Sequence, residues 1–283
     1  MFVFKAAVVG AGTMGGEIAQ VIANAEIPVV LKDVEQKFVD MGLEKARSLW
    51  QGRVDQNKME TQELERKLGL ITGTTSYEEF GDVDFVIEAV PERMEIKQAV
   101  FGELDAVTPG HAILSSNTSS LSITEMGEAT SRSQKVVGFH FFYPASMMRL
   151  IEVIEGDDTA PETTQAAVNF AQAIKKMPIR CGEVPGFVVN RILNSSVSEL
   201  WRFQDETGVD TKEIDKIVSE SKAAPMGPFF LADLLGLDTV LHVAEHLADS
   251  YGERFVVHPG MKQLVAEGNL GAKTGKGFYE HGG

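Results

Sequence analysis

A histidine and a glutamate stand out because each interrupts an apolar run and the two could act together on a proton. Glu152 lies inside the run LIEVI, and His140 follows the run VVGF twelve residues earlier. A lone buried carboxylate is costly unless it is paired. We predict that the two runs are neighbouring strands joined by a turn at Pro144, which brings the side chains together. The carboxylate would fix the imidazole tautomer and prepare Nε2 to take a proton from an alcohol. A core histidine that only satisfies a core acid is the alternative at this point.

A glycine-rich turn is the second candidate site. Gly10, Gly12 and Gly15 follow an expected strand at 3–9 and open an expected helix. In that context the first glycine permits a tight turn, the second lets backbone approach a pyrophosphate, and the third allows close packing of helix on strand. The helix N-terminus then attracts the diphosphate. The pattern predicts a dinucleotide site, and a glycine turn that serves only the fold is the alternative.

Asp33 narrows the choice of dinucleotide. It ends an expected strand at 28–32 and lies 18 residues beyond Gly15. A carboxylate at this place can bond both ribose hydroxyls and would repel a 2′-phosphate. We therefore expect NAD rather than NADP, although the neighbouring Lys32 works against that preference.

These residues need a scaffold whose strands end side by side. Short buried strands are expected at 3–9, 28–32, 83–87, 111–117, 135–142 and 149–154. Helical patterns separate most of them, including a charged segment at 35–69 that Gly52 is expected to break, and a helix is expected at 161–175. Strands that alternate with helices predict an α/β fold with a doubly wound parallel sheet.

The pattern changes after Pro185 and Gly186. The segments 187–206, 212–220 and 236–252 all have helical period, and no strand of comparable strength follows. We place a domain boundary near Val184, with an α/β domain over 1–183 and a smaller helical domain over 184–283.

Composition restricts the possible partners. The net charge is −15, from 26 Lys and Arg against 41 Asp and Glu, which argues against a protein that binds nucleic acid through its phosphates. No apolar stretch reaches the roughly 20 residues of a membrane span, and the first residues lack the features of a signal peptide. The one cysteine, Cys181, fits a reducing compartment, so we expect a cytoplasmic protein.

Taken together, the motifs resemble one enzyme family. In order, they are GAGTMGGEIAQ, FVIEAVPERMEIKQAVF, SSNTSSLSIT, GFHFFYPASMMRLIEVI, PGFVVNRILN, APMGPFFLADLLGLD and GAKTGKGFY. Over essentially its whole length the chain closely resembles the L-3-hydroxyacyl-CoA dehydrogenases. The resemblance implies a Rossmann-like domain and an all-helical domain that forms a homodimer, with the active site between the domains. It also implies reversible, NAD-dependent oxidation of a (3S)-3-hydroxyacyl-CoA in fatty-acid or butyrate-type metabolism.

The resemblance assigns roles by position. His140 matches the catalytic base and Glu152 its paired acid, whereas Ser119 and Asn190 match groups that bond the substrate near its reacting oxygens. Ser48 falls on a CoA-contact position. The positions that match NAD contacts are Gly10, Gly12, Thr13, Met14, Gly15, Asp33, Glu92, Lys97, Ser119, Tyr143 and Lys273.

The sequence departs from the family pattern at two places. Tyr143 stands where the family usually has an Asn that contributes to the NAD site, so the contact near the nicotinamide should differ. A family lysine that contacts CoA is also missing, because Asp55 is the nearest aligned residue. Arg53 or Lys58 could substitute, since a flexible phosphate contact tolerates such a shift.

Two further motifs resemble a metal site and a phosphate loop, but neither fully matches its pattern. His242, Glu245 and His246 have the spacing of some zinc peptidases, but no third ligand follows, so no metal site is expected. The glycines of 271–277 resemble a phosphate loop that is one residue short. Two other functions stay open: a related dehydrogenase of a small hydroxy acid such as a sugar acid, and a non-catalytic NAD-binding or structural protein.

Overall fold

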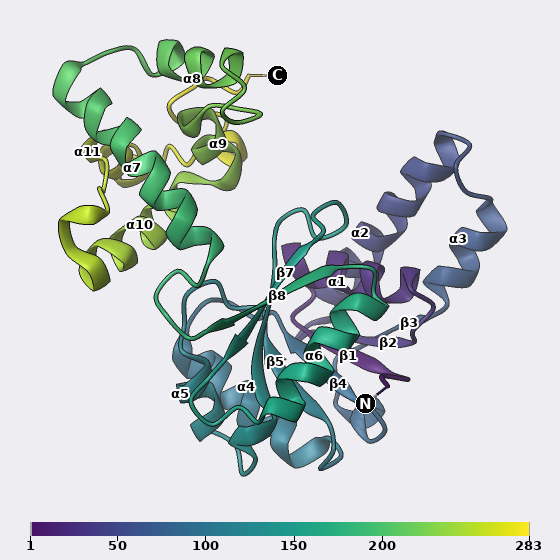
Figure 1. Ribbon diagram of the computed structural model, residues 1–283. Coiled ribbons are helices and arrows are strands. Elements are labelled where there is room, and N and C mark those ends of the chain that lie inside the picture. The colour runs from purple at the N-terminus through teal and green to yellow at the C-terminus, as the bar shows by residue number, and fades with distance from the viewer. Residues whose placement is uncertain (1, 283) are drawn as a thin grey trace. The chain divides into compact units, whose positions relative to one another are not determined.

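The computed structural model describes residues 2–282, and the chain divides into two compact units (Figure 1). Unit 1 ends at Glu183 and unit 2 begins at Val184. Unit 1 contains the whole β-sheet, and unit 2 is built mainly from helices.

The sheet of unit 1 has eight strands within residues 2–282, in the spatial order β3-β2-β1-β4-β5-β6-β7-β8. The strands are β1 (Ala6–Val9), β2 (Val29–Lys32), β3 (Ile71–Thr74), β4 (Phe85–Glu88), β5 (Ile113–Ser116), β6 (Val136–Phe141), β7 (Leu150–Glu155) and β8 (Met177–Gly182). All neighbouring pairs are parallel except β6 and β7. The predicted doubly wound sheet is confirmed, with one antiparallel pair. That pair follows from the short connection over 142–149, which is too short for a parallel crossover.

Helices pack on both faces of this sheet (Figure 1). They are α1 (Thr13–Asn24), α2 (Gln36–Asp55), α3 (Thr61–Leu68), α4 (Met94–Val107), α5 (Ile123–Glu128) and α6 (Pro161–Ala173), with 3-10 turns at Glu78–Phe80 and Ser133–Lys135. The expected break at Gly52 was wrong, because α2 continues through it. One glycine costs a helix only about 1 kcal/mol relative to alanine. The break falls instead between Asp55 and Thr61.

The sequence pattern did not predict two edge strands. β3 has the sequence ITGT and β8 has the sequence MPIRCG, and both are largely exposed. Neither is a continuous apolar run, because an edge strand needs little burial and tolerates Gly or Pro. The pattern of buried apolar residues therefore marked only the central strands.

Alternation along the strands decides which side chains enter the main core. In β6 the core takes Val137, Phe139 and Phe141, and in β7 it takes Ile151 and Val153. These side chains pack in one cluster with apolar residues of α1 and α6. Since successive side chains point to opposite faces, the residues between them project to the other face.

Unit 2 contains α7 (Val189–Thr207), α8 (Thr211–Glu220), α9 (Pro228–Leu235), α10 (Leu237–Tyr251) and α11 (Pro259–Ala266), with 3-10 turns at Gly252–Arg254 and Ala272–Thr274. Its core includes Trp201, Phe229 and Met261. Buried Asp233 fixes the last segment, because its carboxylate accepts the N–H groups of Phe278 and Tyr279. No helix in residues 2–282 is both long enough and apolar enough to cross a membrane.

Candidate active site

The candidate residues of unit 1 gather at one edge of the sheet. Strands β1, β2, β4, β5 and β6 run parallel, so their carboxyl ends meet at this edge. At or just beyond these ends lie the glycine turn at 10–15, Asp33, Glu88, the polar turn at 117–121, and His140. The order of strands reverses between β1 and β4, and ligands of open α/β sheets bind at such a switch point.

The backbone of the glycine turn leaves no room for side chains at two positions. Gly10 has a φ of 101°, and a Cβ there would lie 2.5 Å from the carbonyl oxygen of Ala89. A Cβ on Gly15 would lie 1.7 Å from the carbonyl oxygen of Gly10. At Gly12, by contrast, a Cβ would meet nothing within 4 Å, so the backbone here is open to a bound group. The turn thus has both the tight packing and the open face that a diphosphate requires.

Asp33 is held against this turn. Its Oδ2 accepts the backbone N–H of Ala11 at 2.7 Å, and its Oδ1 accepts that of Val34 at 2.6 Å. Thr13 and Met14 form the first turn of α1, and no side chain among the described residues caps that helix. The helix N-terminus therefore fits the diphosphate of a dinucleotide, and the carboxylate fits a ribose.

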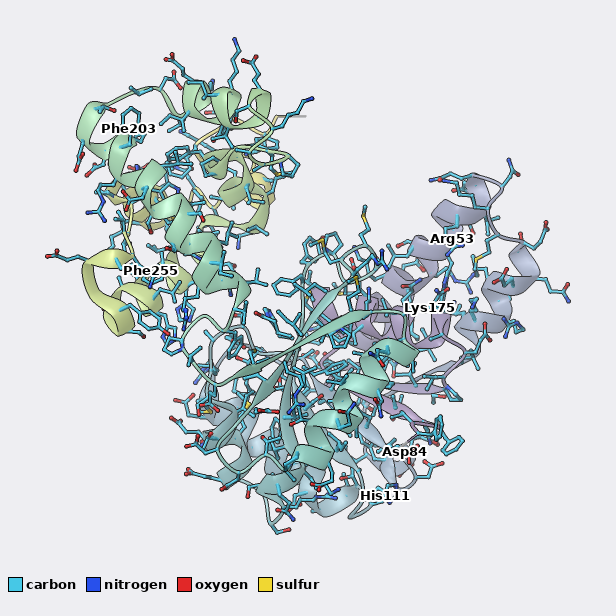
Figure 2. The ribbon with its side chains drawn as sticks, in the orientation of Figure 1. Arg53, Asp84, His111, Lys175, Phe203 and Phe255 are labelled. Carbon is cyan, nitrogen blue, oxygen red and sulfur yellow. The ribbon has the colours of Figure 1, made fainter. Side chains whose placement is uncertain are left out.

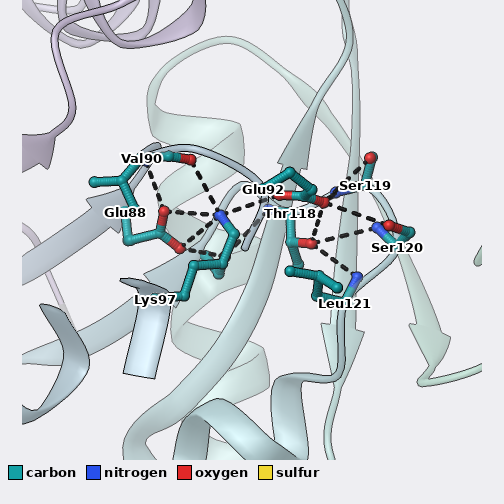
Figure 3. A network of polar contacts seen from close by, with 9 residues as sticks. Glu88, Val90, Glu92, Lys97, Thr118, Ser119, Ser120 and Leu121 are labelled. Atoms are coloured by element: carbon teal, nitrogen blue, oxygen red, sulfur yellow. Dashed lines mark hydrogen bonds and ion pairs between the residues drawn. The ribbon is translucent and has the colours of Figure 1, made fainter. Parts of the chain in front are cut away.

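Glu92, Lys97 and Ser119 lie in one hydrogen-bonded network with Glu88 and Thr118, which Figure 3 shows from close by. Lys97 Nζ lies 2.8 Å and 3.1 Å from the two carboxylate oxygens of Glu88 and 3.1 Å from Oε2 of Glu92. Oε1 of Glu92 accepts the Ser119 N–H at 2.9 Å and the Thr118 hydroxyl at 2.5 Å. The network fixes the polar turn after β5 to the loop after β4.

The pKa values of the two carboxylates in this network shift in opposite directions. Burial raises the pKa of Glu88 above its ordinary value, against the opposing effect of Lys97. Burial also works to raise the pKa of Glu92, but the Lys97 charge and the hydrogen bond from Thr118 outweigh it and lower the pKa. Glu92 is thus the carboxylate favoured to stay ionised. Glu88 and Thr118 were not singled out from the sequence, although Glu88 closes a buried strand and so needed a partner.

His140 and Glu152 form the predicted contact. They are register partners on β6 and β7, and Nδ1 of His140 lies 2.8 Å from Oε2 of Glu152. Glu152 is fully buried and His140 is 6% exposed. Asn117, which the sequence reasoning passed over, accepts the N–H of Phe141 at 2.8 Å and so joins the polar turn to β6 next to His140.

Tyr143 lies in the loop over 142–149 and is 46% exposed. Two buried side chains hold this loop. Glu17 of α1 accepts the N–H and the hydroxyl of Ser146, and Lys176 donates to the carbonyl oxygens of Ala145 and Met148. Neither Glu17 nor Lys176 was recognised as a candidate, because their role depends on contacts that are distant in sequence.

Ser48 and Arg53 lie on one side of a pocket of about 540 Å³ in unit 1. Both belong to α2, and the pocket is lined also by α1, by the loop over 142–149 and by the segment after α6. Asp55 and Lys58 do not line this pocket. Of the two residues proposed to replace the missing lysine, only Arg53 thus reaches it.

The remaining predicted residues, Asn190 and Lys273, belong to unit 2. Asn190 is in the first turn of α7, and its carbonyl accepts from Asn194. Lys273 is exposed, and its Nζ lies 2.5 Å and 2.7 Å from the carboxylate oxygens of Asp238. Their contacts with ligands bound to unit 1 stay predictions.

The metal-like motif is part of helix α10. Within residues 2–282, no group of three or more His, Cys, Asp or Glu side chains is arranged to hold a metal ion. Burial lowers the pKa of His246, and the charge of His242 works in the same direction. Glu245 pairs with Lys262 at 3.2 Å instead.

Comparison with known proteins matches both units. Residues 5–184 match the model for the 3-hydroxyacyl-CoA dehydrogenase NAD binding domain, and residues 186–281 match that for the C-terminal domain of the same family. The chain is 38% identical over 281 residues to a probable 3-hydroxybutyryl-CoA dehydrogenase of Deinococcus radiodurans, covering 98% of this chain and all of that one. The crystal structure of (S)-3-hydroxybutyryl-CoA dehydrogenase from Ralstonia eutropha has a TM-score of 0.94 at 35% identity, with all of both chains covered.

Longer relatives are similar as well. The chain is 38% identical over 279 residues to the fatty acid oxidation complex subunit alpha of Pseudomonas savastanoi, which covers 98% of this chain. This chain spans only 38% of the length of that subunit.

Proposed function

Because the chain belongs to the 3-hydroxyacyl-CoA dehydrogenase family, we propose that it interconverts a (3S)-3-hydroxyacyl-CoA and the 3-oxoacyl-CoA with NAD as cofactor. The observation that carries the proposal is the His140–Glu152 pair, a buried acid and imidazole at the carboxyl edge of a dinucleotide-type sheet. Such a pair suits general-base removal of a proton from an alcohol.

The cofactor would be held by unit 1. The open backbone at Gly12, the first turn of α1 with Thr13 and Met14, and the Asp33 carboxylate support binding of NAD. Bound NAD supplies the acceptor for the hydride that leaves C3 of the substrate. Glu92 and Ser119 would contact it from the polar turn, and the buried Lys97 would act through Glu92, since its ammonium is already bonded to both acids.

His140 is the proposed base. Its Nδ1 faces Glu152, so Nε2 is the nitrogen assigned to the 3-hydroxyl proton. As the C3–O bond gains double-bond character, the proton moves to Nε2 and the Glu152 carboxylate stabilises the imidazolium. In the reverse direction the imidazolium returns the proton to the ketone oxygen. Ser119 and Asn190 would orient the reacting oxygens by hydrogen bonding.

The pocket beside α2 supports an acyl-CoA as substrate. Ser48 and Arg53 both line it. Ser48 would be the CoA-contact position, and Arg53 would replace the missing family lysine. The exposed phenol of Tyr143 would contribute to the cofactor site in a different way from the family Asn. Lys273 is assigned to the cofactor only as a prediction, because it belongs to unit 2.

We also propose a homodimer formed through unit 2 and a cytoplasmic location. Several large apolar side chains of unit 2 are exposed, including Ile192 and Phe203 on α7 and Ile217 on α8, and a second copy would cover such a surface. The cytoplasm rests on the lone cysteine, which is a free thiol.

The test is NADH consumption with acetoacetyl-CoA, run beside free acetoacetate and beside NADPH. Turnover that requires both the CoA ester and NADH supports the proposal. Turnover of free acetoacetate alone would favour the hydroxy-acid reading. Binding of NADH without turnover of either compound would favour a non-catalytic protein.

A further inference from the structure

The pocket beside α2 is rich in positive charge on a strongly acidic protein. Four basic residues line it, namely Arg53, Arg149, Lys175 and Lys176, and no carboxylate of residues 2–282 does. Elsewhere in unit 1, arginines such as Arg47, Arg66 and Arg132 form ion pairs with acids. With a net charge of −15, an unneutralised group of cations indicates an anionic ligand.

The two adjacent lysines differ in what they contact. Lys176 is 9% exposed, and its ammonium donates to the carbonyl oxygens of Ala145 and Met148 at 2.6 Å and 2.7 Å. It therefore holds the loop that carries Arg149. Lys175 is exposed, and its ammonium has no hydrogen bond or ion pair within residues 2–282, as is also true of the Arg53 and Arg149 guanidinium groups.

Lys175 also occupies a backbone position that favours glycine. It follows the C-terminus of α6 with a φ of 62°, and the N–H groups of Lys175 and Lys176 bond back to the carbonyls of Gln172 and Ala171. This is the Schellman ending of a helix, in which the left-handed residue is usually glycine. A lysine here keeps its side chain at the cost of backbone strain.

We propose that Lys175, together with Arg53 and Arg149, binds the phosphate groups of the acyl-CoA nucleotide and so favours CoA thioesters over shorter thioesters. The inference rests on the proposed function, since it assigns one end of the proposed substrate to this pocket. Arg53 projects from α2 and Lys175 from the end of α6, and Figure 2 labels both. The three cations thus come from three separate segments of unit 1 that line the same pocket.

A matched control exists in the same chain. Lys222 has a φ of 60° and follows the C-terminus of α8 with the same type of N–H to carbonyl bond, to Ser219. It does not line the pocket. Lys175→Gly and Lys222→Gly both remove one exposed lysine from a left-handed helix ending, so their effects on backbone strain and net charge are alike.

The experiment compares acetoacetyl-CoA with acetoacetyl-N-acetylcysteamine, which carries the same reacting group and no nucleotide. For Lys175→Gly we expect kcat/KM for the CoA ester to fall about threefold to tenfold through KM, the range of exposed charged contacts. The short thioester should be unaffected. Lys175→Arg should retain the wild-type preference, and Lys222→Gly should leave both substrates unchanged.

Equal losses for both thioesters, or no loss for either, would overturn the assignment of Lys175. If the wild type turns over neither thioester, the proposed function fails, and calorimetry with free coenzyme A then tests the pocket alone. Binding by the wild type that weakens in Lys175→Gly would support the phosphate contacts. No binding by the wild type, or equal binding by both proteins, would contradict them.

Discussion

His140 and Glu152 stand directly opposite each other on the antiparallel strands β6 and β7, with Nδ1 and Oε2 2.8 Å apart. The pairing depends on strand register, because a shift of one residue would turn one side chain toward the main core. Neighbouring β6 and β7 residues such as Phe139 and Val153 are anchored in that core, so the register is strongly specified. Core packing of β6 and β7 therefore positions the proposed base opposite its acid.

We expect Glu152→Gln to lower kcat by about 10²–10⁴, because the neutral amide neither fixes the imidazole tautomer as well nor stabilises the imidazolium. His140→Ala should give a loss in the same range. Since the pair acts as a unit, the double variant should be little worse than His140→Ala. Steady-state kinetics with acetoacetyl-CoA measure these losses, and NADH binding by fluorescence should be unchanged. If the fold losses of the two single variants multiplied in the double variant, the two residues would act independently rather than as a pair.

Asp33→Asn should reduce the preference for NADH over NADPH roughly tenfold, in line with loss of a charged hydrogen bond. The amide can still accept the Ala11 N–H that Asp33 now accepts at 2.7 Å, but it no longer repels a 2′-phosphate. The ratio of kcat/KM for the two cofactors is the measurement, with thermal stability as the control. An unchanged ratio would mean that Asp33 does not contact the ribose.

Lys97→Met should destabilise unit 1 by about 3–5 kcal/mol, because it removes the cation shared by buried Glu88 and by Glu92, the carboxylate favoured to stay ionised. Lys97 is 1% exposed and Glu88 is fully buried, so solvent cannot replace the contact. Urea unfolding measures the loss. Adding Glu88→Gln should recover part of it, since the amide can be buried at lower cost. A loss below about 1 kcal/mol would contradict a stabilising role for the Lys97 ammonium between the two acids.

Predictability differed between parts of the molecule for physical reasons. The central strands and the glycine turn were predictable because continuous apolar runs and glycine spacing reflect local requirements. The His140–Glu152 contact was predictable because an acid inside an apolar strand needs a partner within reach. The edge strands β3 and β8 were not, since neither is buried enough to need an apolar run.

The polar networks were only partly predictable. Glu92 and Lys97 were assigned individually to the cofactor, whereas their bonds to Glu88 and Thr118 join two loops that follow different strands. Similarly, nothing local to Lys176 indicates that it holds the loop over 142–149. Such contacts depend on the packed fold, which residue spacing does not encode.

The stability of unit 2 should depend on pH through His258. This buried residue caps α11, with Nδ1 accepting the Met261 N–H at 3.2 Å and Nε2 lying 2.7 Å from Oε1 of Gln204. Acceptance by Nδ1 requires the neutral ring. Burial lowers the pKa of His258 below its ordinary value of 6.5, although the charge of Asp205 opposes this shift. The unfolded chain therefore binds the proton more readily than the folded chain below about pH 6.5.

The contribution of His258 to the free energy of unfolding should accordingly be largest above pH 6.5 and should fall as the pH drops through that value. His258→Asn should flatten this dependence, because asparagine can cap the helix and does not titrate. Urea unfolding at pH 7.5, 6.5 and 5.5 is the measurement, read by Trp201 fluorescence in a Trp50→Phe background. The background is needed because the chain has two tryptophans and only Trp201 lies in unit 2. The same pH dependence in both proteins would assign the titration to another group, because the substitution removes only the imidazole.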